Sequence, residues 1–184
     1  MASGSEYSKR MEGDAAVFDV TPAKAPKFIA AIGAGVVGIL VGLGAMNDIP
    51  GMAFLIMALG AYAIWYGLRR DIRPKGYKEK STFRVSPTSV EAAGRTFNKD
   101  DIHRLLIRNG ISDQEVSANV QMTVSGAAAA GMAYRAKVGT IANALTLETG
   151  GKSTILAGGM DQTTAFGLLM DVSKVLGFSY REYS

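Results

Sequence analysis

The sequence predicts a hairpin of two transmembrane helices joined to a soluble α+β domain, in which a small antiparallel sheet or barrel is capped by one C-terminal helix. Three observations lead to this fold class. Two apolar segments lie close together in the first half of the chain, segments of alternating polarity follow from Ser81 onward, and one amphipathic helical pattern appears between residues 161 and 177.

The two apolar segments span residues 28–46 and 51–68, and neither contains Lys, Arg, Asp or Glu. Each is close to the roughly 20 residues that a helix needs to cross the hydrocarbon core of a bilayer. Only a short turn separates them, so residues 28–68 are predicted to form a two-helix transmembrane hairpin. A cleaved signal peptide explains them less well, because Leu43 interrupts the small-residue pattern before Ala45 and a second apolar segment follows at once.

Small residues recur every four positions on the first helix, at Ala34, Gly38 and Gly42. Helices in lipid associate by close packing at small residues, since lipid removes most of the hydrophobic drive for contact. This ridge is therefore predicted to pack against the second helix, where Gly60 and Gly67 offer a weaker counterpart. Whether it also packs against neighbouring copies stays open at this point.

Positive charge is concentrated directly after the second apolar segment, in a basic juxtamembrane linker at residues 69–80. Basic side chains favour the cytoplasmic side of a membrane, and aromatic side chains such as Trp65 favour the headgroup level. We therefore predict a multi-pass protein of the bacterial inner membrane with both termini in the cytoplasm. Because the excess positive charge lies in this linker, the formal net charge of +4 does not indicate nucleic-acid binding. The residues assigned to topology or to lipid headgroups are Arg69, Arg70, Arg73 and Lys75.

The composition argues against most catalytic sites, because the chain has no cysteine and one histidine. His103 stands beside Asp100 and Asp101, but neither a nucleophile nor a second ligand is nearby, so an exposed or capping histidine is expected. Residues 150–154 (GGKST) lack the first glycine of a phosphate-binding loop and are predicted to be a hairpin turn. The sequence thus predicts no enzyme, no cofactor, no metal and no small-molecule substrate.

The regions outside the hairpin receive simpler predictions. Residues 1–27 show little apolar periodicity and contain two prolines, so a flexible cytoplasmic tail is expected. Residues 81–184 are predicted to form a cytoplasmic β-domain that opens with a strand around Phe83 and a tight hairpin at Gly94. Residues 100–108 fit either a helix or a strand.

The second half of that domain is predicted to contain more strands and one helix. Alternating polarity at 120–124 and 132–138 predicts two strands joined by a loop at 125–131, and paired glycines predict a hairpin turn at 150–151. The helix 161–177 should begin after Asp161, which is a good N-cap residue, and end at Gly177.

Three stretches carry a resemblance to a known family. They are Phe83-Arg84-Val85-Ser86-Pro87 with Val90-Glu91, the step Phe97-Asn98-Lys99-Asp100-Asp101-Ile102 into a strand, and the hairpin 145–157 followed by the helix 162–176. Together they resemble the pleckstrin-homology-like (PH-like) domains of small bacterial membrane proteins that have a two-helix hairpin. The resemblance implies an adaptor that presents edges and loops to a protein or a lipid headgroup. Some two-helix inner-membrane proteins of this kind belong to secretion or conjugation machines.

The expected function is therefore that of a non-enzymatic, membrane-anchored scaffold or assembly subunit. Its expected partners are membrane lipids and either another protein or further copies of the chain, but not nucleic acid. One alternative is a lipid-sensing module, in which Arg135, Lys137 and the basic linker bind anionic headgroups. A small pore-forming oligomer is a further alternative, which the uncharged helices disfavour because they offer little polar surface to line a pore.

Overall fold

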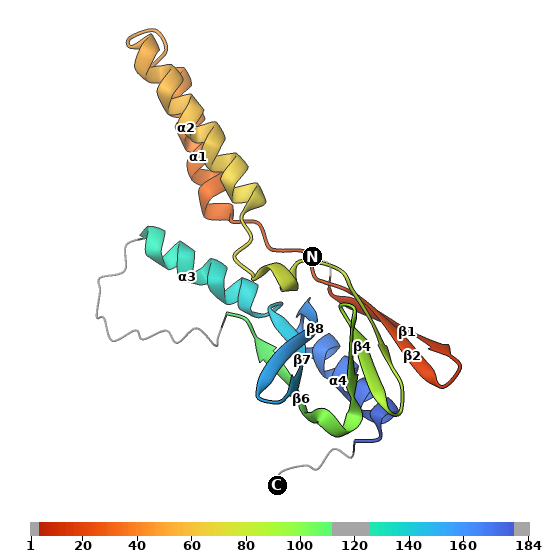
Figure 1. Ribbon diagram of the computed structural model, residues 1–184. Coiled ribbons are helices and arrows are strands. Elements are labelled where there is room, and N and C mark those ends of the chain that lie inside the picture. The colour runs from red at the N-terminus through yellow and green to blue at the C-terminus, as the bar shows by residue number, and fades with distance from the viewer. Residues whose placement is uncertain (1–3, 112–125, 179–184) are drawn as a thin grey trace, which may run out of the picture. The chain divides into compact units, whose positions relative to one another are not determined.

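The computed structural model describes residues 4–111 and 126–178. Within these residues the chain is an α+β protein with two antiparallel sheets and four α-helices (Figure 1), and this agrees with the predicted α+β class of the soluble part. The chain divides into two compact units, and each is described by itself.

The first unit, Met1–Lys24 with Arg73–Asn119 and Ala136–Ser184, contains both sheets. In each sheet the strands follow one another in chain order, and every neighbouring pair is antiparallel. The larger sheet consists of β1 (Glu6–Glu12), β2 (Ala15–Thr21), β3 (Ser81–Val85), β4 (Ser89–Ala92) and β5 (Arg95–Asn98), and the smaller one of β6 (Ile102–Asn109), β7 (Asn143–Thr149) and β8 (Lys152–Met160). Short 3₁₀ turns at Lys75–Tyr77 and Lys99–Asp101 precede β3 and β6.

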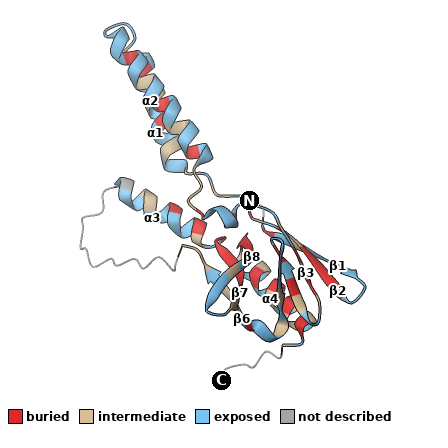
Figure 2. Ribbon diagram, in the orientation of Figure 1, coloured by how far each residue is buried: buried red, intermediate tan, exposed pale blue. Residues whose placement is uncertain are grey.

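Helix α4, Gln162–Leu176, shares one hydrophobic core with both sheets. The Asp161 side chain caps it by accepting a hydrogen bond from the Thr164 backbone N–H at 2.9 Å, and Gly177 ends it in a left-handed conformation with φ 69°. The predicted bounds of this helix are thus confirmed. Fully buried side chains of the core, which fall in the red parts of Figure 2, include Phe18, Phe83, Leu145, Leu147 and Leu168.

The predicted turns around glycine are also confirmed. Gly94 (φ 73°) joins β4 to β5, and Gly150 and Gly151 (φ 52° and 74°) join β7 to β8. Glycine adopts such positive φ values at little cost, and tight antiparallel hairpin turns require them. The ambiguous segment 100–108 is mainly strand, since β6 covers Ile102–Asn109.

The prediction of a flexible tail at residues 1–27 is wrong, because β1 and β2 form a hairpin that joins the larger sheet. Strand β2 pairs with β3 in a register that runs from Ala16 opposite Val85 to Val20 opposite Ser81. The Phe18 ring stacks on Phe83 with the ring centroids 5.3 Å apart. Because β2 is covered on both faces along much of its length, its sequence lacks the polar–apolar alternation that identifies a half-exposed strand.

The prediction of a loop at 125–131 and a strand at 132–138 is also wrong, because α3 covers Gly126–Gly139. Alanine has the highest helix propensity of all residues, and this stretch is rich in it. Tyr134 and Val138 are both buried, and residues four apart share one face of a helix as readily as they share one face of a strand. The other predicted strand, at 120–124, lies outside the described residues.

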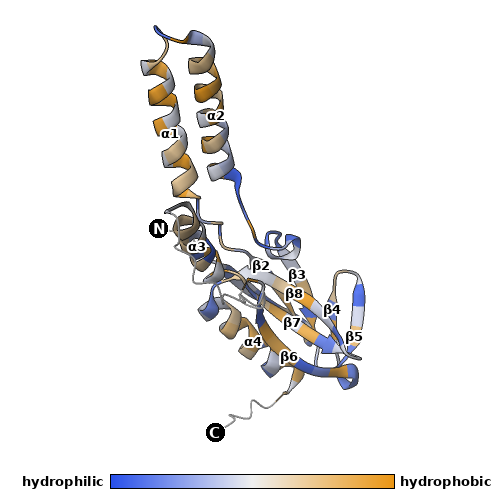
Figure 3. Cartoon of the chain, turned by 90° about the vertical axis from the view of Figure 1, so that its left-hand side faces the viewer, coloured by the Kyte–Doolittle hydropathy of each residue, from blue (hydrophilic) through white to orange (hydrophobic). Residues whose placement is uncertain are grey.

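The second unit, Ala25–Ile72 with Val120–Arg135, is built on helices α1 (Ile29–Gly44) and α2 (Pro50–Arg69). The two helices run antiparallel and pack along their lengths (Figure 3), with apolar colouring along much of both. By length and composition, α2 is the one helix among the described residues that could cross a membrane, whereas α1 is apolar but has 16 residues.

Candidate functional site

The contact between α1 and α2 is made by very small residues. The buried residues of the two helices are Gly35, Gly42, Ala53, Gly60 and Gly67. A Cβ atom added to Gly60 would lie 2.6 Å from the Gly35 carbonyl oxygen, and one added to Gly67 would lie 2.9 Å from the Phe28 carbonyl oxygen. The two backbones are therefore in direct contact, which larger residues at these positions would prevent.

The predicted ridge of Ala34, Gly38 and Gly42 coincides only in part with this contact. Gly42 is buried against α2, and a Cβ atom on Gly38 would lie 3.4 Å from the Gly60 Cα atom. Ala34 is exposed, and the buried position in that turn is Gly35. Gly38 and Gly42 thus face the second helix of the same chain, whereas Ala34 does not, and packing of the ridge against other copies stays a prediction.

Large apolar side chains point away from the contact between the two helices. The side chains are 60% exposed at Val37, 62% at Leu40 and 60% at Leu59. A helix pair in water buries its large apolar side chains and exposes its small or polar ones. The hairpin shows the opposite arrangement, which is typical of helices surrounded by lipid.

Aromatic and basic side chains gather at the C-terminal end of α2. Tyr62 stacks on Tyr66 with ring centroids 6.3 Å apart, and it lies 5.8 Å from the Trp65 ring. The Arg69 guanidinium lies over the Trp65 ring, 5.4 Å from its centroid. Such rings favour the headgroup level of a membrane, and a cation next to them fits the same level.

Arg70 occupies the centre of a cluster of three aromatic rings. Its guanidinium carbon lies 4.9 Å from the Phe28 ring centroid, 5.2 Å from Tyr66 and 5.6 Å from Tyr134. The Tyr134 hydroxyl also donates a hydrogen bond to the Arg70 carbonyl oxygen at 2.5 Å. This ring cluster joins α3 to the ends of α1 and α2. Sequence reasoning missed it, because Tyr134 is distant in the chain and was assigned to a strand.

Arg73 does not face lipid headgroups as predicted. It is 5% exposed, and its guanidinium donates a hydrogen bond to the Ala23 carbonyl oxygen at 2.8 Å. The Ala23 backbone N–H in turn donates to the Gly159 carbonyl oxygen at 2.8 Å. Arg73 therefore fastens the segments before and after the hairpin to each other and to β8. Lys75, by contrast, is exposed on its 3₁₀ turn.

The chain leaves the larger sheet at the end of β2 and returns to it at the start of β3. The register places Val20 directly opposite Ser81. Both α1 and α2 lie in the chain between these two residues. The hairpin segment therefore begins and ends at neighbouring positions of one sheet.

The two other predicted contact residues, Arg135 and Lys137, lie on α3 rather than on a strand. Both are exposed, and so is Met132 on the same helix, at 59%. The sequence of α3, GAAAAGMAYRAKVG, contains no acidic residue. The two cations are therefore accessible to an anionic ligand.

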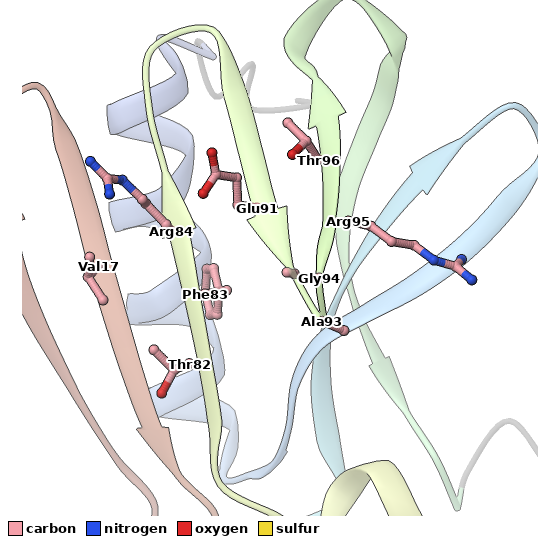
Figure 4. Close-up of a pocket in the computed structure, with 10 residues that line it drawn as sticks. Val17, Thr82, Phe83, Arg84, Glu91, Ala93, Gly94, Arg95 and Thr96 are labelled. Carbon is pink, nitrogen blue, oxygen red and sulfur yellow. The ribbon is translucent and has the colours of Figure 1, made fainter.

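Two open hollows on the first unit have mixed polar linings. One, of about 480 Å³, lies on the face of β2 to β5, where Arg84 and Glu91 sit on neighbouring strands and Arg95 extends away from them (Figure 4). Arg84 also pairs with Glu12 at 3.6 Å. Such a surface supplies charges that suit recognition of a polar partner, but it lacks the enclosed, mostly apolar shape of a small-molecule site.

The second hollow, also about 480 Å³, is lined by Asp100, Asp101 and His103 among others. The structure brings these three residues together, as the sequence suggested, and all three are exposed. Within residues 4–111 and 126–178, no three His, Asp or Glu side chains are grouped so that they could hold a metal ion. Nothing in the described geometry assigns acid–base chemistry to His103.

The N-cap of α4 also ties down the N-terminal segment. The Ser5 hydroxyl donates to the Asp161 carboxylate at 2.6 Å, and the Thr164 hydroxyl donates to the Ser5 carbonyl oxygen at 3.1 Å. Partial burial would raise the pKa of Asp161, but the hydrogen bonds from Ser5 and Thr164 outweigh it and hold the pKa below its ordinary value. The ionised carboxylate is therefore stabilised in the folded protein.

This lowered pKa predicts a specific acid sensitivity. The pKa of Asp161 is lower in the folded than in the unfolded protein. Its contribution to the unfolding free energy is therefore complete above the unfolded pKa of about 4 and is lost as pH falls through the folded pKa. The wild type should therefore lose more unfolding free energy than Asp161→Asn on acidification below pH 4. Urea unfolding of both proteins across pH 6 to 3 measures the difference, and parallel pH profiles would contradict the prediction.

Comparison with known proteins identifies no relative. No protein-family model matches the chain, and no curated protein or solved structure is significantly similar to it.

Proposed function

We propose that this protein crosses a membrane twice through α1 and α2 and holds its α+β domain at the membrane as a non-enzymatic scaffold or assembly subunit. The proposal combines the topology of the larger sheet, the packing of the hairpin and the distribution of charge. Different observations support the membrane part and the scaffold part of the proposal.

The pairing of β2 with β3 carries the membrane part of the proposal. Two strands that exchange hydrogen bonds must lie on the same side of a membrane. A chain that leaves the sheet after Val20 and rejoins it opposite that residue, at Ser81, must cross the bilayer an even number of times. Since α2 is long and apolar enough for one crossing, α1 is the element that provides the return.

The packing of the hairpin supports the same conclusion. Glycine and alanine fill the contact between the helices, while large apolar side chains cover the outside. In water the exposed apolar surface would be costly, but in a bilayer it becomes the lipid-facing surface. Helix α1 is short at 16 residues, and apolar residues in the turn, such as Met46 and Ile49, or local bilayer thinning can make up the difference.

Charge near the ends of the hairpin supports a cytoplasmic position for both termini. Arg69, Arg70 and Lys75 follow α2, Lys24 and Lys27 precede α1, and the opposite turn carries Asp48. Positive residues are retained preferentially on the cytoplasmic side. We therefore place the α+β domain in the cytoplasm, at a bacterial inner membrane.

The scaffold part of the proposal is supported by the architecture of the domain. The two antiparallel sheets and the C-terminal helix expose loops and sheet edges, which are the binding surfaces that the expected PH-like adaptor would use. Strand β5 is a largely exposed edge strand, and the hollow beside it carries Arg84 and Glu91. These features suit a protein partner, including a component of a secretion or conjugation complex.

Labelling of single cysteines tests the membrane part directly, since the natural chain has no cysteine. We expect a membrane-impermeant maleimide to label Asp48→Cys from outside intact cells. Met11→Cys and Thr96→Cys, both exposed, should react only after the membrane is permeabilised. Labelling of all three positions in intact cells, or of none of them until the membrane is permeabilised, would show that the hairpin does not cross the membrane as proposed.

The lipid-sensing alternative is favoured by one observation. Arg135 and Lys137 are exposed on a helix that the ring cluster attaches to the ends of α1 and α2. The pore alternative has weaker support, because the contact face of α1 and α2 consists of glycine and alanine packed backbone against backbone. These observations favour binding of anionic lipid by α3 over a pore.

A further inference from the structure

Helix α3 has one covered face and one exposed face. Tyr134 and Val138 are 4% and 0% exposed, whereas Met132 is 59% exposed. The exposed side consists of small or apolar residues, namely Ala129, Met132, Ala133 and Ala136. At 3.6 residues per turn, Arg135 and Lys137 fall on opposite flanks of this side.

The part of α3 up to Arg135 belongs to the second unit, and the ring cluster fixes where this part lies within that unit. Tyr134 packs against Phe28, with ring centroids 5.0 Å apart, and against the Arg70 guanidinium. Phe28 directly precedes α1 and Arg70 directly follows α2, so α3 is held beside the point where both helices end. The nearby aromatic side chains of α2 mark that point as the headgroup level of a membrane.

We propose that α3 is an interfacial helix that binds the surface of an anionic bilayer. Its apolar side, which includes Met132, contacts the upper acyl region, and Arg135 and Lys137 extend to lipid phosphates on either flank. This inference depends on the proposed insertion of α1 and α2, because the hairpin brings α3 to the membrane surface.

Charge and continuity both favour lipid as the occupant of this surface. Helix α3 carries two cations and no carboxylate, so it complements a negatively charged surface. Basic side chains that border a face of small and apolar residues can extend along the helix surface to reach lipid phosphates. The surface is also continuous with the aromatic end of the hairpin, because Tyr134 contacts Arg70 and Phe28.

The test uses the full-length chain, reconstituted in vesicles with or without phosphatidylglycerol. Three single-cysteine variants carry an environment-sensitive fluorophore at Met132→Cys on α3, at Leu59→Cys on the lipid-facing side of α2 and at Thr96→Cys on β5. Quenching by spin-labelled lipid and quenching by aqueous iodide are measured at each position. We expect lipid quenching at Leu59 in all vesicles, at Met132 chiefly in anionic vesicles, and iodide quenching alone at Thr96.

A charge variant tests the role assigned to the cations. Arg135→Gln combined with Lys137→Gln should reduce lipid quenching at Met132 by about twofold or more in anionic vesicles. The matched control, Arg95→Gln combined with Lys152→Gln, removes two exposed cations from the α+β domain and should leave the quenching unchanged.

The possible failures are distinguishable. Lipid quenching at Leu59 with only iodide quenching at Met132 would overturn the inference about α3 and leave the membrane hairpin intact. Protection of Met132 from both quenchers, increasing with protein density, would mean that α3 packs against a second copy and would equally overturn it. Iodide quenching at Leu59 would instead refute the membrane hairpin, and with it the basis of the inference.

Discussion

Replacement of Gly159 by alanine is expected to lower the unfolding free energy of the α+β domain by about 3 kcal/mol or more. Gly159 has φ 75°, and a Cβ atom there would overlap the Tyr77 carbonyl oxygen and lie 2.7 Å from the Pro22 Cβ atom. Backbone strain and overpacking therefore add to each other. The same change would disturb the Ala23–Gly159 hydrogen bond, at the point where Arg73 fastens the hairpin segment.

Pulse proteolysis of the full-length protein across a urea series measures this loss. The matched control is Gly150→Ala, since Gly150 also has a positive φ, of 52°, but a Cβ atom there meets nothing within 4 Å. Strain alone predicts a loss of about 1 to 2 kcal/mol for the control. Equal losses for the two variants would show that the packing around Gly159 contributes little to stability.

Gly42→Leu is expected to separate α1 from α2. A Cβ atom on Gly42 would lie 2.9 Å from the Ala53 carbonyl oxygen, so even the first carbon of a leucine side chain is too large. Gly38→Leu should have a smaller effect, because its nearest contact is 3.4 Å, to the Gly60 Cα atom. Gly33→Leu is the control, since a Cβ atom there meets nothing within 4 Å.

Spin labels at Leu43→Cys and Met52→Cys report the helix separation in vesicles, because both side chains are exposed near the turn. For Gly42→Leu we expect a longer and broader distance distribution than for the parent, and for Gly33→Leu an unchanged one. Helix insertion itself should persist in all variants, since leucine is more apolar than glycine. An unchanged distribution for Gly42→Leu would show that the helices do not depend on close backbone contact.

The features that the sequence predicted correctly depend on local signals. The α4 helix is bounded by Asp161 and Gly177, and the two hairpin turns are set by Gly94 and the Gly150–Gly151 pair. In each case a few adjacent residues determine the backbone conformation, so no distant partner needs to be known. The apolar helix pair was predictable for the same reason, from composition and a short turn.

The N-terminal hairpin could not be predicted in this way. Strand β2 finds its partner β3 only beyond the whole of α1 and α2, and nothing within residues 15–21 indicates that pairing. Residues Ala15 to Phe18 are all buried, so the strand shows no alternation of polarity. Its place in the sheet is decided by tertiary contacts, chiefly the stacking of Phe18 on Phe83.

The candidate site was predicted in part. Gly38 and Gly42 lie at the helix contact, and Arg69 lies at the aromatic end of α2. Arg73 was misassigned because sequence position shows where a cation is, but not that the Ala23 carbonyl oxygen will accept a hydrogen bond from it. The Arg70 ring cluster could not be predicted for a similar reason. Tyr134 belongs to a helix, but the alternating polarity of its neighbours predicted a strand, and the sequence does not show that this side chain contacts Arg70.

The order of the strands along the chain has a consequence for biosynthesis. During translation β1 and β2 are made first, yet the strand that covers the open edge of β2 is made only after both apolar helices. Under the proposed topology, completion of the sheet must therefore wait until the nascent chain has entered the bilayer and returned. A molecule that inserted only one helix would leave β3 in the wrong compartment, where the sheet cannot close. Its unfinished domain would then be open to proteases, so that correct insertion and survival of the protein are coupled.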